Sequence, residues 1–312
     1  MADLIIHQYD NSPYSEKVRL VLGFKGMQWL AVTVPVIMPK PDLVALTGGY
    51  RCAPALQIGA DVYCDSALIV RQLERLRPTP TLYPDDQPLA EMFAAWADST
   101  LFWTMIPVVM QPPGAARMLP DTSPETMKAF VADRAAFTAG MRRLTPLDAG
   151  VQLVTYLKRI ERQLSDGRAF LFGPAPSIAD FSLAHNVWFM SRLPPSAAVL
   201  APFVRVHDWF ARMSAFGHGR RTPITSERAL QIAADAGRTR APLEFDATLG
   251  IELRRPVAVS AIDYGTDPVV GALVGLTHDE VAVERHDARA GRIVVHFPRI
   301  GYQVRKHEEK PT

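Results

Sequence analysis

Residues 11–19 read NSPYSEKVR and follow the apolar run LIIHQY at residues 4–9. A short apolar run before a turn is typical of a buried strand. Proline is favoured at the first position of a helix, and a serine before it can accept a hydrogen bond from the first turn. The stretch therefore predicts a strand followed by a helix over residues 13–26. The same helix start favours a bound anion because of its free N–H groups and its dipole, so Ser12 is both a cap and a candidate site residue.

The first 80 residues alternate between strand and helix patterns. A second strand is predicted at residues 30–36, LAVTVPV. A hairpin follows over residues 55–64, with a Gly-Ala turn in its middle, and a helix starts at about Ser66. This order predicts an α/β domain over residues 1–80.

The remainder of the chain changes pattern twice. Residues 78–90 are rich in Pro and Asp, as in a linker. Helical patterns then predict an all-helical domain over residues 88–235, a bundle of about five helices at 89–110, 124–143, 146–165, 177–192 and 203–216. Beyond it, short β-branched segments separated by turns predict a small, β-barrel-like domain over residues 243–312.

Composition excludes several classes of protein. The 312 residues are 48% hydrophobic and 21% charged, with a net charge of +2, so nothing favours nucleic acid or a membrane surface as a partner. No uninterrupted apolar stretch predicts a membrane span, and no secretory signal is evident. Two cysteines indicate a reducing compartment, and we expect a cytoplasmic location. The eight histidines lack a metal-ligand spacing, so no metal is expected.

Four motifs occur in a characteristic order. They are SPYSEKVR at residues 12–19, CAPAL at 52–56, CDSALIVRQLE at 64–74, and SIADFSLA at 177–184, where Ser177 and Asp180 predict a capping box. In this order they resemble the glutathione transferase family over residues 1 to about 235. The resemblance implies a thioredoxin-like domain, an all-helical domain, glutathione as co-substrate, a homodimer and a role in detoxification. Ordinary members lack the C-terminal β segment.

The resemblance gives Ser12 a chemical role. In redox-type members of the family a cysteine precedes the proline, whereas several conjugating and isomerising classes have a serine there. A serine cannot form a mixed disulfide, so the implied role of Ser12 is to stabilise the thiolate of bound glutathione. Ser15 and Tyr9 are the alternatives.

The other motifs supply the implied glutathione contacts. In the family the proline of CAPAL is cis, and the backbone of the residue before it, here Ala53 before Pro54, pairs with the cysteinyl part of glutathione. Asp65 and Ser66 are implied to hold the γ-glutamyl end.

The sequence also departs from the family pattern. Cys52 stands where a polar or basic residue is usual, and Arg51 or Lys40 is the candidate substitute. The second substrate is implied to be a small hydrophobic electrophile. Its candidate pocket residues lie at the start of the helical domain: Trp96, Phe102, Trp103 and Met105.

These residues predict a glutathione transferase-like enzyme that activates the thiol for attack on an electrophile. Two alternatives remain: a non-catalytic binding or scaffold protein of the same fold, and a glutathione-dependent isomerase. No nucleic acid or membrane partner is expected.

Overall fold

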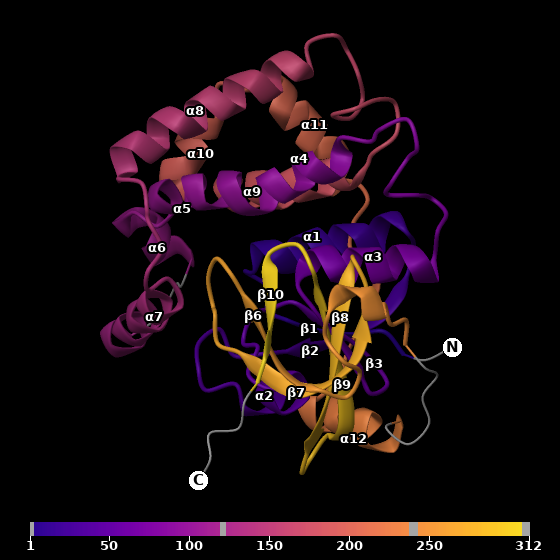
Figure 1. Cartoon of the computed structure of the whole chain (residues 1–312). Coiled ribbons are helices and arrows are strands. Elements are labelled where there is room, and N and C mark those ends of the chain that lie inside the picture. Colours follow the sequence, from indigo (N-terminus) through magenta and orange to yellow (C-terminus); the bar gives the residue numbers. More distant parts are fainter. Residues whose placement is uncertain (1–2, 119–122, 237–242, 308–312) are drawn as a thin grey trace.

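The N-terminal unit of the computed structural model is the predicted α/β domain (Figure 1). The structure describes residues 3–118, 123–236 and 243–307. The elements of this unit are β1 (Ile5–Gln8), α1 (Pro13–Phe24), β2 (Gln28–Thr33), α2 (Pro41–Thr47), β3 (Ala55–Ile58), β4 (Asp61–Cys64) and α3 (Ser66–Leu76). The predicted hairpin has the expected bounds, because a local turn sets the register of its two strands.

A helical domain follows. Its elements are α4 (Ala90–Trp96), the π-helical turn η1 (Ala97–Leu101), α5 (Phe102–Val109), α6 (Pro112–Met118), α7 (Pro124–Phe137), α8 (Pro146–Gln163), α9 (Ile178–Ser191), α10 (Pro194–Leu200) and α11 (Val204–Ser214). The five predicted helices are present. The sequence patterns missed α6 and α10, since each has only seven residues and too few turns to show a period.

One segment of this domain is long and apolar enough to cross a membrane by composition. It is the continuous helical run Ala90–Val109, with a mean hydropathy of 1.2. Within its most apolar window of 18 residues, 44% is buried inside the protein. Its Ala97, Leu101 and Met105 are fully enclosed in the helical core.

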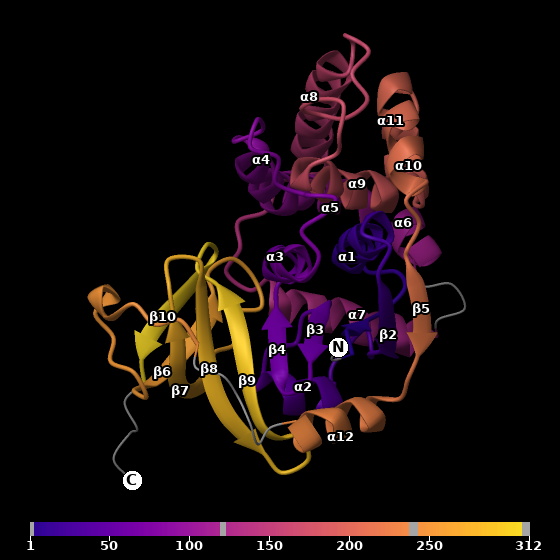
Figure 2. The same ribbon diagram turned by 90° about the vertical axis from the view of Figure 1, so that its right-hand side faces the viewer.

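The C-terminal strands continue the N-terminal sheet. After β5 (Arg220–Pro223), α12 (Ser226–Ala236) and the short 3-10 turn η2 (Ala247–Leu249) come β6 (Pro256–Ala261), β7 (Val269–Leu276), β8 (Glu280–Asp287), β9 (Gly291–Pro298) and β10 (Tyr302–Lys306). The strand order is β10-β6-β7-β8-β9-β4-β3-β1-β2-β5, with β9 parallel to β4 (Figure 2).

The expected β strands are therefore present, and their barrel-like form stays a prediction. What the prediction missed is the connection to the N-terminal unit: β10 pairs with β6, and β9 pairs with β4 at the edge of the thioredoxin-like unit. We call β6–β10, residues 256–306, the β module. The expected domain boundaries stay a prediction.

A shared core explains why the β module joins the sheet. Val62 of β4, Leu273 of β7 and Phe297 of β9 belong to one cluster of enclosed apolar side chains, each at most 1% exposed. Ala229 and Ala233 of α12 cover the same cluster. A segment this small buries little apolar surface alone, so packing against the N-terminal unit supplies its core.

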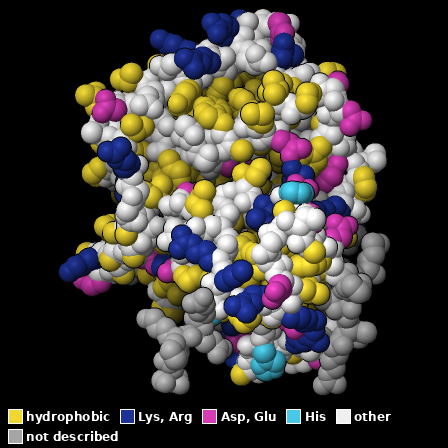
Figure 3. Space-filling model, viewed as in Figure 1, with side chains coloured by type: hydrophobic (Ala, Val, Ile, Leu, Met, Phe, Trp, Pro, Cys, Tyr) yellow, Lys and Arg dark blue, Asp and Glu magenta, His cyan; other side chains and the backbone are white. Residues whose placement is uncertain are grey.

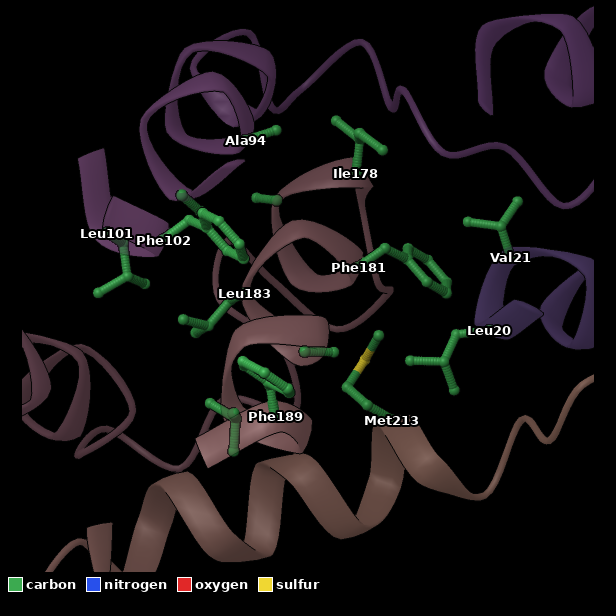
Figure 4. Close-up of a cluster of buried hydrophobic side chains, with 14 of the residues drawn as sticks. Leu20, Val21, Ala94, Leu101, Phe102, Ile178, Phe181, Leu183, Phe189 and Met213 are labelled. Atoms are coloured by element: carbon green, nitrogen blue, oxygen red, sulfur yellow. The ribbon is translucent and has the colours of Figure 1, made fainter. Parts of the chain in front are cut away.

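A second core holds the helical domain on the other face of the sheet. Leu20 and Val21 of α1 lie beside Phe181 of α9 and Met213 of α11 in one cluster (Figure 4). The predicted capping box at the start of α9 is confirmed, with Asp180 accepting from the backbone of Ser177. The two domains thus share one apolar interior above α1 and α3.

The buried His7 makes stability depend on pH. Its side chain is 1% exposed, and Nε2 lies 2.9 Å from Oε1 of Gln57. Burial lowers the pKa of His7 from 6.5 to about 4, so between these values the unfolded chain binds a proton that the folded chain does not. The stability that neutral His7 contributes is therefore fully present above the unfolded pKa of 6.5 and is lost as the pH falls toward the folded pKa of about 4. We expect the free energy of unfolding to drop by about 2 kcal/mol from about pH 7 to about pH 5.

Urea denaturation at the two pH values tests this prediction. His7→Gln should remove most of the difference, because glutamine can still bond to Gln57 but does not titrate. His207→Gln is the control, since His207 is exposed and should leave the difference unchanged. An undiminished pH dependence in His7→Gln would assign the effect to other groups.

Candidate functional site

A cavity of about 630 Å³ opens at the N-terminal end of α1. Its walls come from the α/β unit, from α5 and α7 of the helical domain, and from the loop after β6.

On the face of the molecule in Figure 3, hydrophobic side chains gather over the upper half, where the helical domain lies. Acidic and basic side chains are interspersed on the lower half, so this face presents no continuous charged surface.

Ser12 is one of the polar residues that line this cavity. It is the N-cap of α1, and its Oγ accepts from the backbone N–H of Ser15 at 3.2 Å. The hydroxyl also donates to the carbonyl oxygen of Ala53 at 3.5 Å. That distance is at the long limit for a hydrogen bond, so the Ser12 hydroxyl can instead donate to a better acceptor that enters the cavity. The Ala53–Pro54 peptide bond is cis, as the resemblance implied.

The two alternatives to Ser12 occupy different places. Tyr9 lines the cavity, and burial raises the pKa of its hydroxyl while the charge of Arg134 opposes that rise. Ser15 is fully buried and is absent from the cavity lining. Its hydroxyl has no hydrogen-bond partner among the described residues.

Asp65 and Ser66 begin α3. Asp65 caps the helix by accepting from the N–H of Ala67 at 2.8 Å, and its other carboxylate oxygen accepts from the hydroxyl of Tyr302 at 3.2 Å. Its φ of +78° is unusual for a residue with a side chain and costs about 1–3 kcal/mol. Burial raises the pKa of Asp65, and the Ala67 hydrogen bond opposes that rise. The Asp65–Ser66 pair lies outside the lining of the 630 Å³ cavity.

Four cationic side chains border the cavity: Lys40, Arg51, Arg134 and Arg143. Lys40 is 3% exposed and donates to the carbonyl oxygen of Arg51 at 2.9 Å. Burial lowers the pKa of Lys40 to about 8, so it still carries its charge at neutral pH. Arg51 pairs with Asp133 of α7 and lies over the ring of Phe137, 4.0 Å from its centre. Lys40 and Arg51 thus both border the cavity, and their contact with glutathione stays a prediction.

Cys52 is unsuited to thiol chemistry. Burial raises its pKa to about 12, so the thiol is protonated at neutral pH. Burial likewise raises the pKa of Cys64, which lies in the core.

The predicted electrophile-pocket residues separate into two groups. Phe102 and Trp103 line the cavity. Met105 is 0% exposed in the helical core, and Trp96 packs edge-on against Tyr156. Neither lines the cavity, because a helix presents only one face to it, and their assignment to the pocket is corrected.

Several cavity residues escaped sequence reasoning. Phe130, Arg134 and Phe137 share one face of α7, where their spacing of four and seven residues was the available signal. Tyr264 lies in the turn after β6, and nothing in the sequence indicated that this turn reaches the cavity. Among residues 3–118, 123–236 and 243–307, no group of three or more His, Cys, Asp or Glu side chains forms a metal site.

A buried ionic network lies behind the site. The carboxylate of Asp98, in the π-helical turn, accepts from Lys17 Nζ at 2.5 Å and from Ser182 at 3.1 Å, and it bonds to His185 Nε2 at 2.9 Å. Lys17 Nζ also lies 3.5 Å from Ser66 Oγ. The network therefore connects α1 and the start of α3, in the α/β unit, with η1 and α9 of the helical domain.

Comparisons with known proteins show which family this chain resembles. The family model described as Glutathione S-transferase, N-terminal domain matches residues 6–87, and that described as Glutathione S-transferase, C-terminal domain matches residues 133–212. A maleylpyruvate isomerase from Ralstonia sp is 28% identical over 184 residues, which cover 58% of this chain and 80% of that protein.

Solved structures agree. A glutathione transferase from Phanerochaete chrysosporium shares the fold at a TM-score of 0.55 and 19% identity, covering 69% of this chain and 97% of that one. About a third of this chain therefore has no counterpart there. A GST-like protein from Pseudomonas syringae matches at a TM-score of 0.81 and 42% identity, covering 98% of this chain and 100% of that one. From these matches over both domains, the chain belongs to the glutathione transferase family.

Proposed function

We propose that this protein binds glutathione at the N-terminal ends of α1 and α3 and activates its thiol for attack on a small electrophile. The observation that carries the proposal is the position of Ser12. Its hydroxyl lies 3.5 Å from the carbonyl oxygen of Ala53, the residue before the cis-proline, and it lines a cavity that also has aromatic walls.

The chemistry follows from this placement. A free thiol has a pKa near 8.5, and each unit of depression corresponds to about 1.4 kcal/mol in favour of the thiolate. A hydrogen bond donated by Ser12 and the dipole of α1 both favour the negative charge on sulfur. The aromatic wall then holds the electrophile beside the thiolate, which raises the rate by proximity.

A second function, glutathione-dependent isomerisation, has support from the charge of the cavity. Lys40, Arg134 and Arg143 suit a substrate that bears a carboxylate, and one relative is named for an isomerase of an organic acid. Addition of the thiolate to a conjugated double bond gives a single bond that can rotate. Expulsion of the thiolate restores the double bond and leaves glutathione unchanged.

Calorimetric titration of the full chain with glutathione tests the proposal. Binding in the micromolar to millimolar range is expected. If no heat is detected at millimolar glutathione, the enzyme proposal is wrong and a scaffold role replaces it. Following total thiol during turnover separates the two chemistries, because a transferase consumes one glutathione per product and an isomerase consumes none.

Ser66→Ala should weaken glutathione binding about tenfold, or about 1.4 kcal/mol. A hydroxyl bonded to a carboxylate contributes about 1.5–3 kcal/mol, and the lower end applies because the backbone N–H groups at the start of α3 remain. Calorimetry measures the change. Ser99→Ala is the matched control, since the Ser99 hydroxyl is exposed and bonds only to Ala95 of its own helix among the described residues. Equal affinities for both variants would remove Ser66 from the binding site.

A further inference from the structure

The β module reaches the cavity through the loop that follows β6. In Figure 1 this loop rises toward α5 and α6. The backbone N–H of Gly265 donates to the carbonyl oxygen of Phe137, the last residue of α7, at 3.1 Å. Gly265 has a φ of +62°, and a Cβ there would lie 2.9 Å from the Phe137 ring and 3.4 Å from Cys52 Sγ. A glycine is therefore required for the loop to approach this closely.

Tyr264 uses that approach to form part of the cavity wall. Its ring packs edge-on against Trp103, with centroids 5.0 Å apart, and lies 5.8 Å from Phe137. All three side chains line the cavity. The aromatic wall is thus built from three distant parts of the chain, and one of them is the β module.

Trp103 adds a polar requirement to this wall. Its Nε1–H is buried and has no acceptor among the described residues. A buried donor without a partner destabilises the free protein, and an acceptor oxygen on a ligand would relieve that cost. Arg134 and Lys40, on the same cavity, also favour an acceptor with negative charge.

The β module touches the site at a second point. The Tyr302 hydroxyl, from β10, donates to Asp65 at 3.2 Å. Asp65 holds a strained backbone conformation, and its carboxylate is fixed from one side by Ala67 and from the other by Tyr302. Tyr302 is therefore one of two hydrogen-bond donors that hold the Asp65 carboxylate in place.

We propose that the β module completes the binding site within the same chain. Tyr264 is a specificity-determining residue for a planar, conjugated electrophile that carries an acceptor oxygen, and Tyr302 is a positioning residue that orients Asp65 toward the glutathione amino group. This inference rests on the proposed function, because both residues are assigned relative to bound glutathione.

The experiment compares full-length variants by calorimetry with two probes, glutathione and S-(4-nitrobenzyl)glutathione. The second probe carries a planar group with acceptor oxygens into the electrophile pocket. Tyr264→Ala should weaken the nitrobenzyl conjugate about tenfold and glutathione less than about twofold. Tyr264→Phe, which retains the ring, should bind both probes as the wild type does.

Tyr302→Phe should behave differently. Both probes should weaken by the same factor, about fivefold, because the change acts at the γ-glutamyl end. Glutathione acetylated on its amino group has no ammonium for Asp65. It should bind more weakly than glutathione does, and equally to the wild type and to Tyr302→Phe. A merely structural role of Tyr302 would instead weaken all three probes together.

Two controls keep the inference falsifiable. Ile300→Ala, at an exposed position of the same module, should leave every affinity unchanged. Thermal melting confirms folding, and Tyr264→Leu replaces Tyr264→Ala if that variant is unfolded. If the folded Tyr264 variant binds the two probes with the same ratio of affinities as the wild type, the inference is overturned. The proposed function still stands in that case, provided that the wild type binds glutathione. A wild type that binds neither probe overturns both.

Discussion

Replacing Asp98 with alanine should lower the free energy of unfolding by about 3–5 kcal/mol. Burial raises the pKa of Asp98, but the Lys17 ammonium and the His185 hydrogen bond outweigh burial, so the pKa lies below its usual value and the carboxylate is charged. Lys17 is 0% exposed, and its strongest contact is this carboxylate, 2.5 Å away. Without Asp98 its charge stays buried and uncompensated. Urea denaturation at neutral pH measures the loss.

Two further variants separate an ionic effect from a packing effect. Replacing both partners, Lys17→Met with Asp98→Leu, should recover most of the lost stability, because no buried charge remains. Glu91→Ala removes the partner of Arg71 in an exposed pair, with side chains 38% and 48% exposed, and should cost less than about 1 kcal/mol. If the double variant is as unstable as Asp98→Ala alone, packing and not charge explains the loss.

Ser12→Ala should raise the thiol pKa of bound glutathione by about one to two units and lower turnover at neutral pH about ten- to a hundredfold. A hydrogen bond to a charged acceptor contributes about 1.5–3 kcal/mol, which corresponds to that shift. Glutathione affinity should change less than turnover, because the Ser12 hydroxyl acts on sulfur while the peptide ends bind elsewhere. Absorbance of the thiolate during a pH titration measures the pKa, and steady-state kinetics measure turnover.

The neighbouring residues supply the controls. Ser15→Ala removes a hydroxyl three residues away that is off the cavity, and it should leave the thiol pKa unchanged. Ser12→Thr keeps a hydroxyl and a cap, and it should retain a low pKa. Because Ser12 also caps α1, Ser12→Ala should in addition lose about 1 kcal/mol of stability. Tyr9 would be the residue that stabilises the thiolate if the thiol pKa of bound glutathione rose to the free value of about 8.5 in Tyr9→Phe and stayed unchanged in Ser12→Ala.

Features with a local physical cause could be predicted from the sequence. The hairpin over residues 55–64, the cap at Ser12 and the capping box at Ser177 each depend on residues a few positions apart. Local rules of turn and cap geometry therefore fix them before the chain is packed. The same rules placed Ser12 and Asp65 at helix starts, where an anion or a polar ligand end is favoured.

Contacts between distant segments were decided only by the tertiary structure. The strand period shows which face of a strand is buried but not which strand lies beside it, so the parallel pairing of β4 with β9 was not foreseen. That pairing brings Asp61 and His296, 235 residues apart in sequence, within 2.6 Å, and it carries Tyr302 to Asp65. Packing also decided that Met105 joins the core while Trp103, two residues earlier, faces the cavity. The sequence alone determined the family motifs and the helix starts, whereas the completed site required long-range burial of apolar surface, which no local pattern encodes.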